Sequence, residues 1–316
     1  MEPFVFIVGC ARSGTTLLQR ILDAHPQVAV TPELHWITES SPKETWLDPE
    51  SRVTPEQVAG MVGHKRFRQL EFTREEFEEL LPSGEPIPYA PFLEGLFALY
   101  GRNKGKPLVG NKTPAYVRRL ATLHALWPRA KFVHLIRDGR DVALSVLRWN
   151  HADRTAGKYA TWAEDPVTTT ALWWRRKVLS GREGGQLLGP DLYYELCYER
   201  LVAHADEGCA SLCAFLGVRY EPAMLRFHEG RTRHDPGMDA KKAWLPITPG
   251  LRDWRRQMAS DAVERFEAAA GDLLDDLGYP RAYPRPSAKA LRHATTIANA
   301  FARAVLSPPG ALSDLR

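Results

Sequence analysis

The segment that decides the fold spans residues 4–22 and reads FVFIVGCARSGTTLLQRIL. Its first part, Phe4 to Val8, is apolar throughout and is typical of a strand buried on both faces of a parallel sheet. A loop with two glycines follows at 9–14, and apolar residues then recur at helical spacing as far as Leu22. The first N–H groups of a helix have no intrahelical partner and carry partial positive charge. A strand, a glycine loop and a helix in this order therefore predict a phosphate-binding turn.

The loop differs from two well-known phosphate-binding loops. Gly9 and Gly14 have the spacing of the nucleotide-triphosphatase P-loop, but Thr15 stands where the lysine of that loop should be. The loop can bind a phosphate, yet it lacks the cation that kinases place on the transferring group. Cys10 is followed six positions later by Thr16, where a cysteine phosphatase has an arginine. Side chains that can donate to an anion surround the loop: Arg12, Ser13, Thr15 and Thr16.

The composition predicts one large α/β domain. The chain has 316 residues, 44% of them hydrophobic, which is enough for a full core. The 42 basic and 38 acidic residues leave a net charge of +4, too small to indicate nucleic-acid binding. The four cysteines show neither a metal-binding nor a disulfide pattern. No signal peptide or membrane-spanning run is recognisable, so we expect a cytoplasmic protein.

A second short strand, Val28 to Val30, precedes Glu33. A carboxylate at the C-terminal end of a strand beside the phosphate loop lies where open α/β sheets bind ligands. The following residues, 39–107, contain many prolines and short helical patterns near 55–69 and 74–81. We interpret this stretch as a helical insertion or lid over the ligand-binding edge of the sheet.

Two further strands are predicted beyond this insertion. One ends at Lys112 and is followed by a helix over about 115–126; the other spans 130–136 and ends at Arg137. A helical pattern containing Ser145 comes next. An arginine that leaves a strand beside a helix N-terminus predicts a second anion site in the same sheet.

These motifs, taken together and in order over about residues 4–280, resemble the sulfotransferases, above all the tyrosylprotein and related bacterial sulfotransferases. The matching pieces are RSGTTL at 12–17, Glu33, NK at 111–112, RDGRD at 137–141 with Ser145, YERLV at 198–202 and FLG at 215–217. The resemblance implies a P-loop-type three-layer α/β sandwich with a central, mainly parallel sheet flanked by helices.

The resemblance also implies 3′-phosphoadenosine-5′-phosphosulfate (PAPS) as the donor and adenosine 3′,5′-bisphosphate (PAP) as the product, without a metal. Residues 12–16 (Arg12, Ser13, Gly14, Thr15 and Thr16) would bind the 5′-phosphosulfate. Arg137 and Ser145 would bind the 3′-phosphate, and Tyr198 the adenine side. Glu33 would be the general base, and Lys112 with Arg12 would stabilise the transferring group. A sulfuryl group carries less charge than a terminal phosphate, so loop amides and two cations can suffice.

The chain departs from the family pattern in two places. Arg148 lies about one residue from a further arginine of the tyrosine enzymes, so that role is not assigned to it. Thr248 stands where relatives have a nucleotide-binding lysine, which leaves Lys241, Lys242 and Arg252 as unranked substitutes.

Other conspicuous residues receive structural roles. His134, inside a predicted strand, is expected in the core, whereas His35 beside Glu33 is open between the two roles. The run WWRRK at 173–177 is expected to be a helix with a buried aromatic face. We place the sulfotransferase domain at 1–283, and a linker and amphipathic helix at 284–316.

Three hypotheses for the function remain open. The first is a sulfotransferase acting on a hydroxyl of a small molecule, glycan, lipid or peptide, with a homodimer possible. The second is a P-loop kinase of a small substrate, which Thr15 opposes. The third is a non-catalytic nucleotide-binding protein, which would have no need of Glu33 and Lys112.

Overall fold

A parallel five-stranded sheet forms the centre of the protein. The computed structural model describes residues 4–34, 52–54, 56, 58, 67–80, 86–229 and 245–306. The sheet has the order β2-β5-β1-β6-β7, and every neighbouring pair is parallel. Its strands are β1 (Val5–Gly9), β2 (Val28–Thr31), β5 (Leu108–Lys112), β6 (Lys131–Ile136) and β7 (Tyr193–Cys197). A short antiparallel pair, β3 (Arg52–Val53) and β4 (Ile87–Pro88), lies apart from this sheet.

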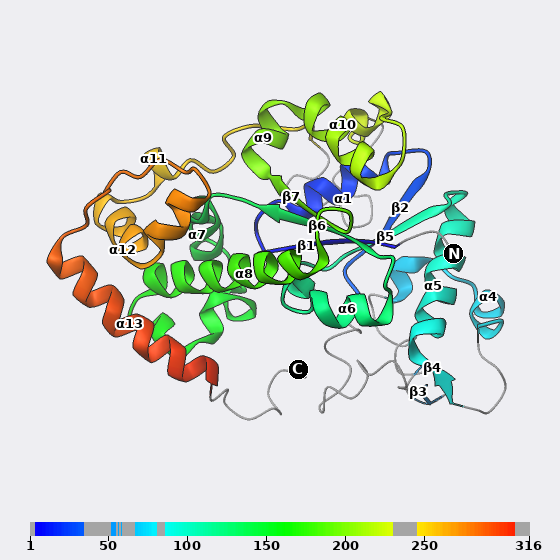
Figure 1. Ribbon diagram of the computed structural model, residues 1–316, viewed down its shortest axis with the longest axis horizontal. Coiled ribbons are helices and arrows are strands. Elements are labelled where there is room, and N and C mark those ends of the chain that lie inside the picture. Colours follow the sequence, from blue (N-terminus) through cyan, green and yellow to red (C-terminus); the bar gives the residue numbers. More distant parts are fainter. Residues whose placement is uncertain are drawn as a thin grey trace.

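Helices cover both faces of the sheet (Figure 1). The longer ones are α1 (Thr15–Asp23), α5 (Tyr89–Lys104), α6 (Leu120–Leu126), α7 (Gly139–Leu147), α8 (Pro166–Leu188), α10 (Ala205–Leu216), α12 (Ser260–Asp276) and α13 (Ala288–Leu306). The shorter α-helices are α4 (Arg74–Glu78), α9 (Tyr198–Ala203) and α11 (Trp254–Gln257). Single turns of 3₁₀-helix are Phe67–Leu70, Pro114–Arg118, Ala152–Arg154, Ala156–Lys158, Ala160–Ala163 and Pro222–Arg226.

The alternation of side chains along β1 explains the three layers. Val5 and Ile7 pack in one core with residues of α1, α9 and α10. Phe6 and Val8 point to the opposite face and pack in a second core with residues of α5 and α6. Successive strand residues face opposite sides, so a continuous apolar strand must be covered twice. The predicted α/β fold of P-loop type is confirmed.

The stretch interpreted as a lid contributes a helix to the core. α5 packs against β2 and β5, and its Phe92, Leu96 and Phe97 are buried in the same core as Phe6. α5 is therefore a flanking helix of the sheet, beside β2 and β5. Residues 35–51 and 59–66, which include His35, lie outside the described part of the chain.

The single helix expected over about 115–126 is divided. A 3₁₀ turn, Pro114–Arg118, is followed by α6, and Arg119 between them has φ −131° and ψ 22°. The turn packs on β1 and buries Tyr116 and Val117. A continuous helix would lose this contact, so tertiary packing overrides the helical pattern.

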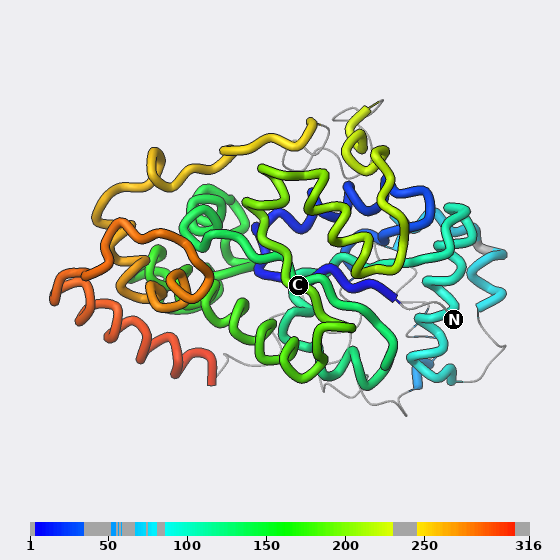
Figure 2. The backbone as a smooth tube through the Cα atoms, turned by 45° about the horizontal axis from the view of Figure 1, so that its top comes forward, coloured from blue at the N-terminus to red at the C-terminus, as the bar shows by residue number. Residues whose placement is uncertain are grey.

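The expected linker after residue 280 is anchored to the domain. The backbone N–H groups of Ala282 and Tyr283 donate to Glu267 Oε1 and Oε2 at 3.1 and 2.7 Å. α13 then packs along α12 and α8 through Ala290, Ala294 and Ile297, and Figure 2 shows it beside α12 at the end of the molecule opposite α5. The described part of the C-terminal segment therefore packs on its own domain.

None of the helices in the described residues is long and apolar enough to cross a membrane.

Candidate active site

The predicted site residues follow all five strands at one edge of the sheet. In a parallel sheet the carboxyl ends of neighbouring strands meet at the same edge, where such folds bind ligands. Across this edge, in the order of the sheet, lie Glu33 after β2, Lys112 at the end of β5, the loop 10–14 after β1, Arg137 after β6 and Tyr198 after β7. Residues far apart in the sequence are thereby brought into one row.

The shape of the loop after β1 depends on its glycines. Gly9 has φ +152°, and a Cβ there would lie 2.6 Å from the carbonyl oxygen of Leu135. Gly14 has φ +97°, and a Cβ there would lie 2.5 Å from the Tyr198 ring. Arg12 adopts φ +74°, which is unusual for a residue other than glycine. The loop is thus held in a narrow turn between β6 and Tyr198.

The N-terminus of α1 forms the floor of the loop. Thr15 and Thr16 are the first residues of this helix, and its N-cap, Gly14, has no side chain to cap it. The first N–H groups of α1 have no intrahelical acceptor, so they can bind an oxyanion. The hydroxyl of Ser13 is buried and has no hydrogen-bond partner among the described residues.

Arg12 joins the loop to α7. Its Nε donates to Ser145 Oγ at 3.0 Å, and its guanidinium lies 4.8 Å from the centre of the Trp149 ring. Burial lowers the pKa of Arg12; the nearby Arg252 and Arg137 lower it further, whereas Glu33 raises it. Three arginines therefore converge on this edge of the sheet.

Arg252 is a C-terminal basic residue that lies near Arg12 in the described part of the chain. The sequence left it unranked beside Lys241 and Lys242, which lie outside the described residues. Its position near Arg12 is set by α11, which packs on α7. Only the tertiary structure brings a residue so distant in sequence to this edge.

Arg137 is fixed by two neighbours. Its terminal nitrogen donates to Asp141 Oδ2 at 3.2 Å, and its guanidinium lies 4.4 Å from the centre of the Tyr198 ring. Tyr198 is buried between this guanidinium and Gly14, and burial raises the pKa of its hydroxyl. Sequence reasoning gave Asp141 no role, although it lies within the RDGRD motif.

Glu33 and Lys112 form an ion pair at the other end of the row. Lys112 Nζ donates to Glu33 Oε1; the lysine side chain is 5% exposed and the glutamate side chain 33%. Asn111 Nδ2 donates to Thr31 Oγ1 at 2.9 Å and to the carbonyl of Pro32 at 3.4 Å. These bonds tie the end of β5 to the turn that carries Glu33, so the Asn-Lys pair sets the place of the carboxylate.

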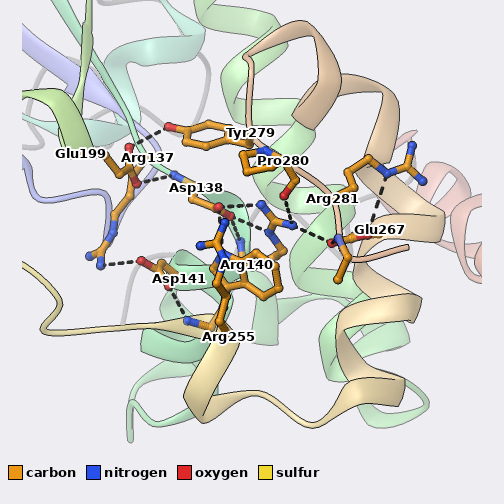
Figure 3. A network of polar contacts seen from close by, with 12 residues as sticks. Arg137, Asp138, Arg140, Asp141, Glu199, Arg255, Glu267, Tyr279, Pro280 and Arg281 are labelled. Carbon is orange, nitrogen blue, oxygen red and sulfur yellow. Dashed lines mark hydrogen bonds and ion pairs between the residues drawn. The ribbon is translucent and has the colours of Figure 1, made fainter. Parts of the chain in front are cut away.

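A buried ionic network supports the Arg137 side of the site (Figure 3). Asp138 caps α7 and binds Arg140 at 2.7 Å, and Arg140 also binds Glu267 of α12 at 2.6 Å. The Arg140 guanidinium stacks on Trp254 at 3.7 Å. The backbone N–H of Asp138 donates to Glu199 at 2.9 Å. The loop after β6 is thus connected to both α9 and the C-terminal helices.

Other candidates from the sequence have structural positions. His134 is fully buried and lies 2.6 Å from the hydroxyl of Tyr193, and burial lowers its pKa to about 3. Trp173 and Trp174 are buried, as expected, and the indole of Trp174 donates to the carbonyl of Arg137. Arg148 is exposed and binds Gln257. In the described part of the chain, no three histidine, cysteine or acidic side chains are grouped as metal ligands.

The site suits a ligand with more than one anionic group. Among the buried side-chain donors that lack a hydrogen-bond partner in the described residues, Ser13 Oγ, Arg137 Nε and Arg252 Nε lie at this edge of the sheet. Buried donors without partners are costly in a folded protein. Oxygens of a bound oxyanion can satisfy them.

Comparisons with known proteins agree with this geometry. The model of the sulfotransferase family matches residues 3–222. The chain is 27% identical over 300 residues to a protein-tyrosine sulfotransferase of Drosophila melanogaster, an alignment that covers 90% of this chain and 54% of that protein. It is 26% identical over 307 residues to protein-tyrosine sulfotransferase 1 of Mus musculus, covering 92% of this chain and 75% of that protein. The chain thus spans about half the length of the fly relative.

Two solved structures share the fold. The sulfotransferase domain of the Synechococcus PCC 7002 olefin synthase superimposes with a TM-score of 0.61 at 24% identity, covering 88% of this chain and 95% of that one. The sulfotransferase domain of the curacin biosynthetic pathway gives 0.55 at 19% identity, covering 94% and 98%. The family model matches more than half of this chain. The chain therefore belongs to the sulfotransferase family, whose members are transferases of sulfur-containing groups.

Proposed function

We propose that this protein transfers a sulfuryl group from PAPS to a hydroxyl group of an acceptor, with Glu33 as the general base. The observation that carries the proposal is the row of side chains along one sheet edge. Anion-binding groups occupy its centre and one end, and the Glu33–Lys112 ion pair occupies the other. A donor site beside an acid–base site is what a group transfer requires.

The donor would be held by two groups of residues. The loop amides with Arg12, Ser13, Thr15 and Thr16 would bind the 5′-phosphosulfate. Arg137 and Ser145 would bind the 3′-phosphate, with Arg252 as a further cation and Tyr198 holding Arg137 in place. PAPS would supply the activated sulfuryl group, and PAP would remain after the transfer.

Glu33 would take the proton of the acceptor hydroxyl. Its carboxylate is one third exposed and therefore accessible to an acceptor, while Lys112 keeps it oriented. Lys112 can then stabilise negative charge that develops beside the loop during transfer. Several carboxylates follow sheet strands at this edge. In the described part of the chain, Glu33 is the one that is both partly exposed and paired with a lysine at the end of a strand.

We propose a tyrosyl hydroxyl as the first acceptor to test. Support comes from the two relatives described above, both protein-tyrosine sulfotransferases. Small-molecule, glycan and lipid hydroxyls remain in the test, because residues 35–51, which follow Leu34, are outside the described part of the chain.

The direct experiment is incubation of the protein with PAPS labelled in its sulfate and a panel of acceptors. The panel contains tyrosine peptides, phenols, sugars and long-chain alcohols. The proposal expects an acceptor to gain the mass of one sulfate, with PAP formed in equal amount, and Glu33→Gln to slow both by about 10²–10⁴-fold. Transfer of phosphate from ATP, or nucleotide binding without any transfer, would favour the kinase or the non-catalytic hypothesis instead.

A further inference from the structure

Asp141 is an ionisable group next to the donor site that the proposed reaction does not use. Its Oδ2 accepts a hydrogen bond from Arg137 at 3.2 Å, and its Oδ1 accepts one from the backbone N–H of Trp254 at 2.9 Å. The side chain is only 12% exposed. Figure 3 shows it between Arg137 and the start of α11.

The groups around Asp141 do not neutralise it fully. Arg137 at the end of β6 is its one cationic hydrogen-bond partner within the described residues, and α11 contributes only a backbone N–H. Asp138 on the same loop and Tyr198 of α9 are the other ionisable groups that interact with it. A second carboxylate nearby and partial burial both oppose a negative charge on Asp141.

Arg137 is also the residue to which the 3′-phosphate would bind. A phosphate at its guanidinium would bring further negative charge next to Asp141 in a buried setting. Two anions that share one arginine cannot both keep full charge without a large cost. The carboxylate is the one that can become neutral, because a proton on it leaves the hydrogen bond from Trp254 intact.

We propose that Asp141 takes up a proton from solvent when the 3′-phosphate of the nucleotide binds to Arg137, so that binding of PAPS and release of PAP are linked to pH. This inference rests on the proposed function, since it needs a 3′-phosphorylated nucleotide in this site. In the ligand-free protein Asp141 holds Arg137 as a charged partner; in the complex it is a neutral neighbour of the phosphate.

The pH range follows from the free protein. Burial raises the pKa of Asp141 to about 6, against the opposing effect of Arg137. Below pH 6 the carboxyl already carries the proton, and binding takes up none. Above pH 6 binding requires Asp141 to take up a proton from solvent, so affinity falls by up to about tenfold per pH unit until the pKa in the complex is reached.

The test compares the parent with Asp141→Asn, whose amide oxygen can still accept from Trp254. PAP affinity is measured by calorimetry from pH 5.5 to 8.5 for both proteins. The ratio of the variant's affinity to the parent's should rise at least tenfold between pH 5.5 and 8, because only the parent needs a proton. The protonation state of free PAP changes with pH in the same way for both proteins, so its effect cancels in the ratio of affinities.

Two controls isolate the cause. Adenosine 5′-phosphate lacks the 3′-phosphate, so with it the ratio should not change with pH. Asp272→Asn removes a carboxylate that pairs with Arg175 on the surface, so it should bind PAP like the parent at every pH. This variant shows whether the loss of one negative charge elsewhere on the protein changes PAP affinity.

A measurement on the parent alone avoids dependence on the variant's folding. Calorimetry at pH 7.5 in two buffers of different ionisation enthalpy should show net proton uptake with PAP and less with adenosine 5′-phosphate. A phosphate monoester has its second pKa at about 6, so it is already mostly dianionic at this pH and releases few protons on binding.

A flat affinity ratio, or equal proton uptake with both nucleotides, would overturn the role of Asp141 while leaving tight PAP binding and the proposed function in place. PAP binding no tighter than adenosine 5′-phosphate at any pH would instead remove the proposed function, and this inference with it.

Discussion

Lys112, the last residue of β5, forms an ion pair with Glu33, which lies two residues beyond the end of β2. The two residues are 79 positions apart and meet because β2 and β5 are neighbouring parallel strands, with Thr31 opposite Asn111. The pair combines an accessible carboxylate with a buried ammonium at the edge where the phosphate loop also ends. The first two predictions test its members separately.

Glu33→Gln removes the proposed base but keeps the size and polarity of the side chain. Turnover should fall by about 10²–10⁴-fold, the usual contribution of a general base, whereas PAP affinity should stay within a few-fold of the parent. Steady-state kinetics and calorimetry measure the two quantities. Glu71→Gln is the matched control, since Glu71 also pairs with a lysine, Lys104, but on the surface. Turnover of Glu33→Gln close to the parent's would rule out this carboxylate as the base.

Lys112→Ala should lower turnover more than it lowers donor affinity. The ammonium is placed to act on charge that develops during transfer, and an interaction made only in the transition state appears in kcat rather than in binding. Lys104→Ala, which removes an exposed lysine, should leave both quantities unchanged. A loss confined to PAP binding would give Lys112 a binding role only.

Arg137→Ala should weaken PAP binding by about 10- to 150-fold, which corresponds to one charge-assisted hydrogen bond of about 1.5–3 kcal/mol. Removal of the 3′-phosphate from the ligand should cost the parent a similar factor. The two losses should not add, because each removes the same contact. Calorimetry of both proteins with PAP and adenosine 5′-phosphate closes this cycle. Tighter binding of ATP with magnesium than of PAP by the parent would favour a kinase.

Arg140→Met should destabilise the fold by about 3–5 kcal/mol. Arg140 is fully buried, and its loss leaves Asp138 and Glu267 without their shared cation. Denaturant unfolding measures the change. The control is Arg175→Met, whose partly exposed pair with Asp272 should contribute no more than about 1 kcal/mol. Equal effects of the two substitutions would mean that the buried network contributes no more than a surface pair.

His134 should make the fold sensitive to acid. Burial lowers its pKa to about 3, so between about pH 6.5 and pH 3 the unfolded chain binds a proton that the folded protein excludes. The free energy of unfolding should therefore fall as pH falls, by about 1.4 kcal/mol per unit from this residue. In His134→Gln the slope between pH 6 and 4 should be shallower by that amount, whatever the cost in packing. Replacement of the exposed His204 by Gln should leave the slope unchanged, and an unaltered slope in His134→Gln would refute the assignment.

The features of this protein that depend on neighbouring residues could be predicted from its sequence. The apolar run Phe4–Val8, the glycines of the loop and the helical spacing after it define β1, the anion-binding turn and α1 within about twenty residues. Glu33, Lys112 and Arg137 were recognisable in the same way, because each follows a strand whose own pattern is strong. Edge strand β7 gave no such pattern, since its residues are only partly buried and of mixed polarity.

Which of these residues meet depends on how the strands and helices pack. The strand order β2-β5-β1-β6-β7 brings Lys112 to Glu33 and separates both from Arg137. The packing of α11 on α7 brings Arg252 toward Arg12 and a backbone N–H of Trp254 onto Asp141. Hydrogen bonds to Glu267 of α12 also anchor the segment after Pro280, where the sequence suggested a linker. Local spacing fixes the elements, but pairing of strands and helices depends on burial of surfaces that are distant along the chain, and no short stretch of sequence contains that information.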